Sequence, residues 1–250
     1  MTFDIFFLSY KEPNAAENWQ QLTKLFPRSK WIRDVQGEAN AFRTCARESS
    51  TDHFLVVEGD NWLLDSFSLS LTQYHTPDQK LHVFRSLNPV NGLIYGFGAV
   101  KLWPKHQVLA FKDENPLDFP LAVATNGVVI EPIIASETRF NADPFHSFRG
   151  AYREVYKLMS GQCGYAQQKP SVETNRRIEI WLTRGRENQF GAECLIGARA
   201  GAYHARHGLE GQLINDWDYM NEMFKLCLEI EHQRKVCQNL QDYHLSPIEI

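Results

Sequence analysis

The sequence predicts an α/β fold in which helices cover a parallel sheet. Between residues 4 and 60, short apolar runs rich in β-branched and aromatic residues alternate with stretches of helical periodicity. The order strand, helix, strand, helix, strand with short connections predicts parallel strands joined by right-handed crossovers. The chain of 250 residues is 43% hydrophobic and has no internal repeat or low-complexity linker. We therefore expect a single domain.

The first elements follow one another closely. An apolar run predicts a strand over residues 4–10, and Asn14 stands where an N-cap would begin a helix over 15–25. A short second strand is expected over 30–35 and a second helix over 40–48.

The third strand ends in two acidic residues. Its apolar run, Phe54–Val57, is typical of a strand buried on both faces, and Glu58, Gly59 and Asp60 follow it. Two carboxylates two residues apart can bind the same hard divalent cation. Such a cation prefers oxygen ligands and commonly binds protein carboxylates and the phosphates of a substrate together. Open α/β sheets bind ligands at this end of their strands. We interpret Glu58 and Asp60 as metal ligands; the alternative is an acidic loop that only terminates the strand.

Beyond Asp60 the alternation is less regular. Strand material is expected at residues 63–71, 81–85 and 128–130, with a stretch rich in glycine and aromatic residues over 91–103. Helices are then expected over 144–159, 171–183 and 216–240, the second of them capped by Ser171.

Polar side chains at the end of the first strand are candidates for binding a nucleoside. The ring of Tyr10 and the hydroxyl of Ser9 could contact a base or its ribose, and Glu12 could accept hydrogen bonds from ribose hydroxyls. The alternative is that Ser9 and Glu12 shape a turn while Tyr10 packs against the body of the protein.

The segment before and within the helix over 144–159 is dense in functional groups. Arg149 and Arg153 are four residues apart, so they share a helix face and could hold phosphate oxygens. Asp143 and Glu154 are the two candidates for a general base in a sugar transfer with inversion. The alternatives are an N-cap role for Asp143 and a salt bridge to an arginine for Glu154.

Two histidines and a run of arginines follow. His204 or His207 could supply a third metal ligand, or both could be solvated loop residues. Six arginines without a lysine suit phosphate contacts, although interspersed glutamates are also typical of a solvated helix face. These arginines are Arg176, Arg177, Arg184, Arg186, Arg199 and Arg206.

Composition and missing motifs exclude several classes of protein. The net charge of −4 does not suit non-specific wrapping of nucleic acid. The five scattered cysteines have no zinc-finger or redox spacing. No apolar run is long enough to span a membrane, so a cytoplasmic protein is expected. The sequence has no phosphate-binding loop of the P-loop kind, no dinucleotide fingerprint after the first strand and no nucleophile elbow of a serine hydrolase.

Ten blocks of sequence together carry a family resemblance over nearly the whole chain. They are Asp4–Pro13, Asn18-Trp19, Gly37, Asn40, Glu58-x-Asp60, Gly98–Leu102, Arg139–Asn141, Pro144-Phe145, Phe148–Glu154 and Asn215–Trp217. With these blocks the chain resembles a group of GT-A fold glycosyltransferases that occur in bacteriophages and include relatives of the kinetoplastid base J glucosyltransferase.

The resemblance implies a GT-A-like fold and a transferase that uses a UDP-sugar with Mn or Mg. Glucose or arabinose would be moved to the hydroxymethyl group of 5-hydroxymethylcytosine, or of another hydroxymethylpyrimidine, in phage DNA, which protects that DNA from host nucleases. Lys101 would then face the sugar or the phosphates, as would Arg149 and Arg153. GT-A enzymes usually carry Asp-x-Asp at the metal, and Glu58 departs from that pattern.

Two other functions remain open at this stage. The acceptor could be a cell-surface polysaccharide or a protein, or the chain could be a non-catalytic module that binds nucleotide sugars or nucleic acid. Within the single domain, 1–250, residues 1–100 would form the nucleotide-sugar half and residues 101–250 the acceptor half with the C-terminal helices.

Overall fold

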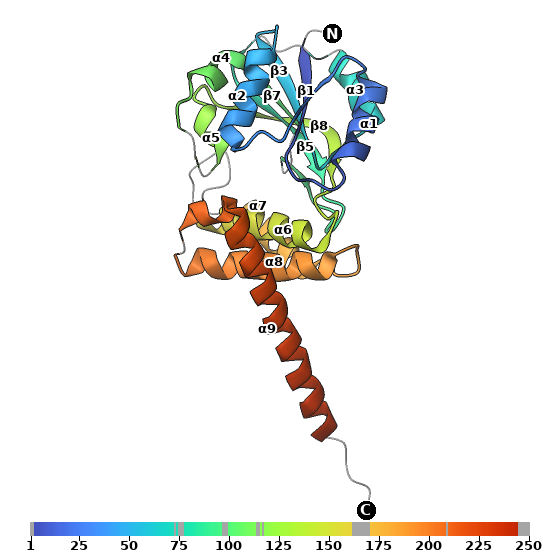
Figure 1. The fold of residues 1–250 in the computed structure, drawn as a ribbon, viewed down its shortest axis with the longest axis vertical. Helices are drawn as coiled ribbons and strands as arrows, with labels where there is room; N and C mark the ends of the chain where they lie inside the picture. Colours follow the sequence, from blue (N-terminus) through green and yellow to red (C-terminus); the bar gives the residue numbers. More distant parts are fainter. Residues whose placement is uncertain are drawn as a thin grey trace, which may run out of the picture.

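The computed structural model describes residues 3–72, 74, 78–96, 100–113, 116, 118–161, 171–208 and 210–244. It consists of an α/β layer, a helical layer beneath it and a long C-terminal helix that projects away from both (Figure 1). The α/β architecture expected from the sequence is confirmed, and a sheet flanked by helices is consistent with a GT-A-like domain. No helix in the described ranges is long and apolar enough to cross a membrane.

The N-terminal part of the sheet has the predicted parallel order. Strand β1 (Asp4–Ser9) lies between β2 (Lys30–Arg33) and β3 (His53–Glu58) and is parallel to both. Helix α1 (Ala15–Leu25) packs on one face of these strands, and α2 (Glu38–Glu48) packs on the other. These helices bury the strands on both faces, which explains their continuous apolar runs.

The rest of the sheet is mixed. Its strand order is β2-β1-β3-β7-β5-β8-β4, with β6 paired to β5. Strand β7 is antiparallel to both β3 and β5, and β8 is parallel to β5. The bounds are β4 (Asn61–Leu63), β5 (Leu81–Leu87), β6 (Ile94–Tyr95), β7 (Val100–Pro104) and β8 (Val128–Thr138). Three short helices, α3 (Asp65–Thr72), α4 (Lys105–Ala110) and α5 (Phe119–Val123), complete this layer.

The expected strand over 63–71 is wrong. The chain forms β4 and then helix α3, in which Phe67 and Leu71 are buried four residues apart while Leu69 is 72% exposed. A helix buries Phe67 and Leu71 on one face, although the alternating serines and leucines of this stretch are also typical of a strand. Part of the stretch over 91–103, described from the sequence only as rich in glycine and aromatic residues, forms β6 and β7, and Gly98 and Ala99 lie outside the described residues.

The helical layer contains α6 (Pro144–Ser160), α7 (Val172–Thr183) and α8 (Gly191–Arg206), followed by a short 3-10 helix, η1 (Gly211–Asn215), and α9 (Trp217–His244). Helices α6 and α8 approach closely because two glycines of α8 face α6. A Cβ at Gly197 would lie 2.1 Å from the Phe148 carbonyl oxygen, and one at Gly201 would lie 2.3 Å from that of Tyr152. The sequence patterns did not predict the helix over 191–206.

The sheet therefore ends at Thr138 and the helical layer begins at Pro144. This boundary places the acidic end of β3 and the arginines of α6 in different layers of the molecule (Figure 1). The functional division near residue 100 stays a prediction.

Candidate active site

A cleft of about 520 Å³ lies where the sheet meets the helical layer. The sheet side includes Glu58 at the end of β3, Asp60 after it and Lys101 on β7, and the helical side includes residues of α6 and α7. Charged residues of both signs line it in equal number. The acidic ones are Glu12, Glu38, Glu58, Asp60, Asp118, Glu154 and Glu173, and the basic ones are Arg85, Lys101, Arg139, Arg149, Arg153, Lys157 and Arg177.

The glycine between the two predicted metal ligands, Gly59, is required because a larger residue would clash with its neighbours. A Cβ at Gly59 would lie 2.7 Å from the Glu12 carboxylate and 2.8 Å from Cβ of Ser9. Gly59 does not have a positive φ angle, so its backbone conformation does not require glycine. Instead, Gly59 lets the end of β3 lie directly against the loop after β1.

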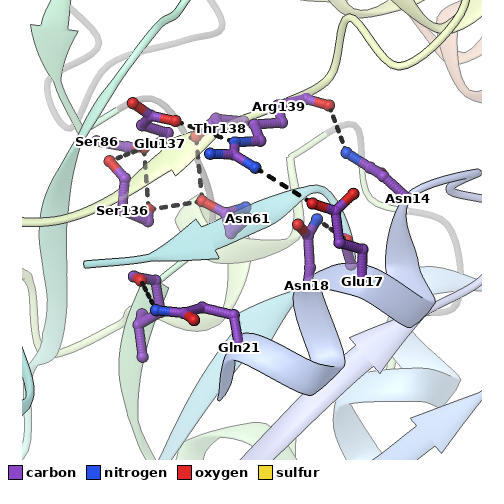
Figure 2. Close-up of polar contacts among 12 residues, drawn as sticks. Asn14, Glu17, Asn18, Gln21, Asn61, Ser86, Ser136, Glu137, Thr138 and Arg139 are labelled. Carbon is purple, nitrogen blue, oxygen red and sulfur yellow. Dashed lines mark hydrogen bonds and ion pairs between the residues drawn. The ribbon is translucent and has the colours of Figure 1, made fainter. Parts of the chain in front are cut away.

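Hydrogen bonds from three directions hold the acidic loop. The amide of Asn18 on α1 donates to the Gly59 carbonyl (2.8 Å), and the backbone N–H of Arg139 donates to the Asp60 carbonyl (2.6 Å). The amide of Asn61 donates to the Asp60 carboxylate (2.7 Å). Figure 2 shows how Asn18 and Arg139 approach this region from α1 and from the end of β8. The loop is thus fixed before any ligand binds.

The two acidic side chains have different surroundings. The Lys101 ammonium lies 3.1 Å from the Glu58 carboxylate and forms an ion pair with it. Burial, followed by the nearby charges of Glu58 and Glu12, raises the pKa of Asp60 to about 7. Lys101 offsets only part of this repulsion. A cation bound at Asp60 would offset the repulsion that the charges of Glu58 and Glu12 exert on this carboxylate.

These residues fit a divalent cation shared with a substrate. Asp60 and Glu58 supply hard oxygen ligands, and Mg²⁺ is commonly bound by one or two carboxylates together with substrate phosphates. Over the described part of the chain no cluster of three or more His, Cys, Asp and Glu side chains could hold a metal by itself. The ligand set is therefore one that phosphate oxygens and water would complete.

The opposite wall is cationic and incompletely paired. Arg149 and Arg153 both line the cleft from α6, as their spacing predicted. The guanidinium of Arg149 stacks on the Trp217 ring at 4.0 Å, and Arg153 donates to the Asn215 side chain (2.7 Å). Within the described ranges the buried Nε atoms of both arginines have no hydrogen-bond partner. Burial, followed by the charge of Arg153, lowers the pKa of Arg149 well below its usual value.

Two further groups on α6 continue this wall. Lys157 follows Arg153 by four residues, lines the cleft and pairs with Asp118 (3.0 Å). The Glu154 carboxylate accepts a hydrogen bond from the Tyr95 hydroxyl (2.7 Å), which in turn accepts from the Trp181 indole (3.0 Å). Burial raises the pKa of Glu154. The alternative interpretation, in which Glu154 forms a salt bridge to an arginine, does not describe its closest contact.

The predicted nucleoside-binding residues lie beside the cleft. Glu12 lines it, and its carboxylate accepts from the Tyr10 backbone N–H (2.7 Å). The Tyr10 ring is 6.0 Å from the ring of Trp217, itself a lining residue. The Ser9 hydroxyl accepts a hydrogen bond from the Trp31 indole (2.8 Å), which is a structural contact.

Three predicted site residues are not brought to the cleft. Asp143 caps α6 by accepting from the His146 backbone N–H (2.7 Å) and also binds the His146 ring (2.8 Å). His204 is buried in α8 against the Tyr152 hydroxyl, and His207 stacks on Tyr203 at 4.0 Å. Both histidines belong to the end of a helix and not to a loop, and neither joins the acidic pair as a metal ligand.

Sequence analysis missed several lining residues. Trp217 was named only within a block of the family resemblance and was given no role in the site, yet it contacts Tyr10, Arg149 and the Lys11 ammonium (4.8 Å). Lys157 could have been found because it extends the spacing of four residues set by Arg149 and Arg153. Glu38 at the start of α2 and Asp118 just before α5 also line the cleft and carry no local signal.

Part of the arginine run is paired locally. Arg176 and Arg177 both lie near the Glu173 carboxylate on α7, at 3.8 and 3.2 Å. Arg177 also lines the cleft and lies over the Tyr95 ring at 4.7 Å. For these two residues the interpretation as a charged helix face describes the structure.

No family model matches the chain, and no curated protein matches it. Among solved structures, HddC from Yersinia pseudotuberculosis is similar with 14% identity and a TM-score of 0.28 over 46% of this chain and 61% of HddC. The mannosyltransferase PcManGT from Pyrobaculum calidifontis, solved in complex with GDP-Man and Mn²⁺, is similar with 10% identity and a TM-score of 0.42. That match covers 91% of this chain and 86% of PcManGT. Both likenesses are too low to carry an activity to this chain.

Proposed function

We propose that this protein is a metal-dependent glycosyltransferase. It would move glucose or arabinose from a UDP-sugar to the hydroxymethyl group of 5-hydroxymethylcytosine, or of another hydroxymethylpyrimidine, in phage DNA. The observation that carries the transferase proposal is the cleft in which Asp60, fixed by hydrogen bonds, faces the incompletely paired Arg149 and Arg153. The acceptor rests on the family resemblance of the sequence alone.

The acidic wall of the cleft suits the cation of a metal–diphosphate, and the cationic wall suits the diphosphate. Asp60, with Glu58 beside it, would hold Mn or Mg, which neutralises charge on the leaving diphosphate when it is bound. Arg149 would donate to diphosphate oxygens, because its guanidinium is buried, keeps its ring contact with Trp217 and has a free Nε donor among the described residues. Tyr10, Trp217 and Glu12 would contact the nucleoside.

Of the two candidate bases, Glu154 suits the role better than Asp143. Glu154 lines the cleft and is buried, and this burial raises its pKa toward the range useful for proton transfer. Asp143 already caps α6. In the proposed transfer the acceptor oxygen bonds to the anomeric carbon, the bond from that carbon to the diphosphate breaks, and the acceptor proton passes to Glu154.

The donor is tested by thermal shift with UDP-glucose, UDP-arabinose, UDP-galactose and GDP-mannose, each with and without Mn²⁺. We expect a UDP-sugar with Mn²⁺ to raise the melting temperature, since binding to the native state stabilises it. If none of the four raises it in either condition, a nucleotide-sugar donor is excluded.

The acceptor is tested by incubating the protein with the stabilising donor and duplex DNA that contains cytosine, 5-hydroxymethylcytosine or 5-hydroxymethyluracil. Mass spectrometry of the nucleosides should show a hexose or pentose only on a hydroxymethylated base. Donor turnover that yields no glycosylated nucleoside would remove DNA from the proposal and leave the polysaccharide or protein acceptor.

A further inference from the structure

Asn61 occupies a buried polar position with no part in the chemistry described so far. It is the first residue of β4 and follows Asp60 directly. Asn61 and Ser136 are fully buried, and Ser86 and Thr138 are 1% and 2% exposed. Burying four polar side chains together costs free energy unless each is hydrogen-bonded, so such a group points to a structural or functional requirement.

The hydroxyls of this group determine how the Asn61 amide is oriented. Ser136 and Thr138, both on β8, donate to the Asn61 amide oxygen at 2.7 and 3.1 Å. The Ser86 hydroxyl on β5 lies 2.7 Å from the Thr138 hydroxyl and 2.9 Å from the Ser136 carbonyl, and its single proton can be donated to either oxygen. Figure 2 shows these side chains gathered around Asn61. With its oxygen occupied twice, the amide can present only its NH₂ group to Asp60.

The Asn61 NH₂ donates to one oxygen of the Asp60 carboxylate, Oδ1, at 2.7 Å. An ionised carboxylate only accepts hydrogen bonds, so this contact is the favourable orientation for both groups. The other oxygen, Oδ2, has no hydrogen bond to any described residue, and Asp60 lines the cleft. The contact therefore restricts rotation of the carboxylate and leaves one oxygen available.

We propose that Asn61 is a positioning residue that makes Asp60 a one-oxygen ligand for a small octahedral cation. This inference rests on the proposed metal-dependent function. A carboxylate fixed through one oxygen suits Mg²⁺, which needs near-ideal octahedral geometry, and Mn²⁺, which binds in octahedral oxygen sites of the same kind. Ca²⁺ accepts six to eight oxygens in flexible geometry, often with a carboxylate bound through both oxygens. The buried polar side chains of β4, β5 and β8 thus favour one kind of cation over another through the orientation of Asp60, without contacting the cation themselves.

The test is titration calorimetry of Mn²⁺ and of Ca²⁺ in the presence of UDP, on the wild type, Asn61→Ala and Gln21→Ala. Gln21 is the matched control, because its buried amide also holds this stretch, through the Leu63 carbonyl (3.2 Å), but does not touch Asp60. We expect Asn61→Ala to weaken Mn²⁺ binding about tenfold or more, as loss of a residue that orients a metal ligand does, and Ca²⁺ binding much less. Gln21→Ala should leave both affinities unchanged even if its melting temperature falls.

Three results would overturn the inference: unchanged Mn²⁺ affinity in Asn61→Ala, equal loss for Mn²⁺ and Ca²⁺, or the same loss in Gln21→Ala. If Asn61→Ala does not fold, Ser136→Ala removes one of the two hydroxyls that orient the amide, and it should lower the ratio of Mn²⁺ to Ca²⁺ affinity by a smaller factor. An unchanged ratio in that variant counts against the inference as well. Failure of the wild type to bind Mn²⁺ with UDP would instead reject the proposed metal-dependent function.

Discussion

The two walls of the cleft are built in opposite ways. The acidic loop on the sheet side is held by hydrogen bonds from Asn18, Asn61 and the backbone of Arg139. The cationic wall on α6 is held by packing, with Gly197 and Gly201 bringing α8 against its backbone. Among the described residues its arginines keep unpaired buried donors. The loop of one wall is therefore held in place by hydrogen bonds within the protein, and the other wall lacks acceptors that an anionic ligand would supply.

This difference separates what each wall contributes. The sheet wall holds the Asp60 carboxylate in one orientation, as a metal ligand requires. This arrangement is destabilised by the repulsion between Asp60 and the charges of Glu58 and Glu12. The helical wall provides positive charge where burial weakens its solvation. The variants below are chosen to damage one wall and spare the other.

The largest expected effect comes from Asp60→Asn. Removing the carboxylate should lower Mn²⁺-dependent turnover of the donor about a thousandfold, because a bound cation contributes several kcal/mol to stabilising the leaving group. Asp52→Asn is the control, since Asp52 is an exposed carboxylate just before the opposite end of β3. Steady-state rates measure the effect, and turnover in Asp60→Asn equal to that of the wild type would contradict the metal assignment.

Arg149→Met tests the helical wall. We expect the KM for the donor to rise about 10- to 100-fold, the range for losing hydrogen bonds to a charged group. The melting temperature without ligand should not fall, because the variant removes a buried cation that lacks an ion pair among the described residues. The control is Arg176→Met, whose side chain is 72% exposed on α7. An unchanged KM in Arg149→Met would show that this arginine does not contact the donor.

Gly201→Ala tests how the helical wall is held. The added Cβ would meet the Tyr152 carbonyl oxygen of α6, so the variant should lose about 1–3 kcal/mol of unfolding free energy in urea. Arg199→Ala, an exposed position on the same helix, should change stability by less than about 0.5 kcal/mol. Helix propensity alone would make Gly201→Ala stabilising. A gain in stability would therefore refute the close contact between α6 and α8.

The smallest expected effect is a dependence on pH that comes from Asp60 on the sheet wall. The pKa of Asp60 is raised to about 7 from an ordinary value of 3.8, so the folded state binds its proton more tightly than the unfolded state. The protonated form therefore stabilises the protein fully below pH 3.8, and this stability is lost as the pH rises toward 7. Asp60 is only half-buried, so solvent screens much of this effect. In EDTA, Asp60→Asn should melt above the wild type by about 2–4 °C at pH 8 and show no such difference near pH 4. A difference that does not change with pH would contradict the burial of this carboxylate.

Sequence patterns predicted the parts of the fold that depend on local periodicity. The three parallel strands, helix α1, helix α6 and the shared face of Arg149 and Arg153 all follow from spacing within one element. Asp143 and Ser171 take N-cap positions for the same local reason. Periodicity failed at α3, where a short amphipathic helix resembles an alternating strand.

The remaining features of the site depend on contacts between distant residues, which a single sequence does not reveal. Trp217 reaches the cleft only because η1 and α9 return to α6. Asn61 meets Ser136 and Thr138 only after β4 pairs with β8, and the sequence in between gives no signal of that pairing. His204 and His207 look like a ligand pair in sequence, but tertiary packing places one against Tyr152 and the other against Tyr203.

The most direct test of the account is calorimetric titration of the wild type and Asp60→Asn with UDP-glucose, in Mn²⁺ and in EDTA. The account predicts that the wild type binds the donor in Mn²⁺ and loses most of its affinity in EDTA. Asp60→Asn should bind weakly in both conditions. Equal binding by the wild type with and without Mn²⁺, or full Mn²⁺-dependent binding by Asp60→Asn, would show that Asp60 does not hold a metal–diphosphate.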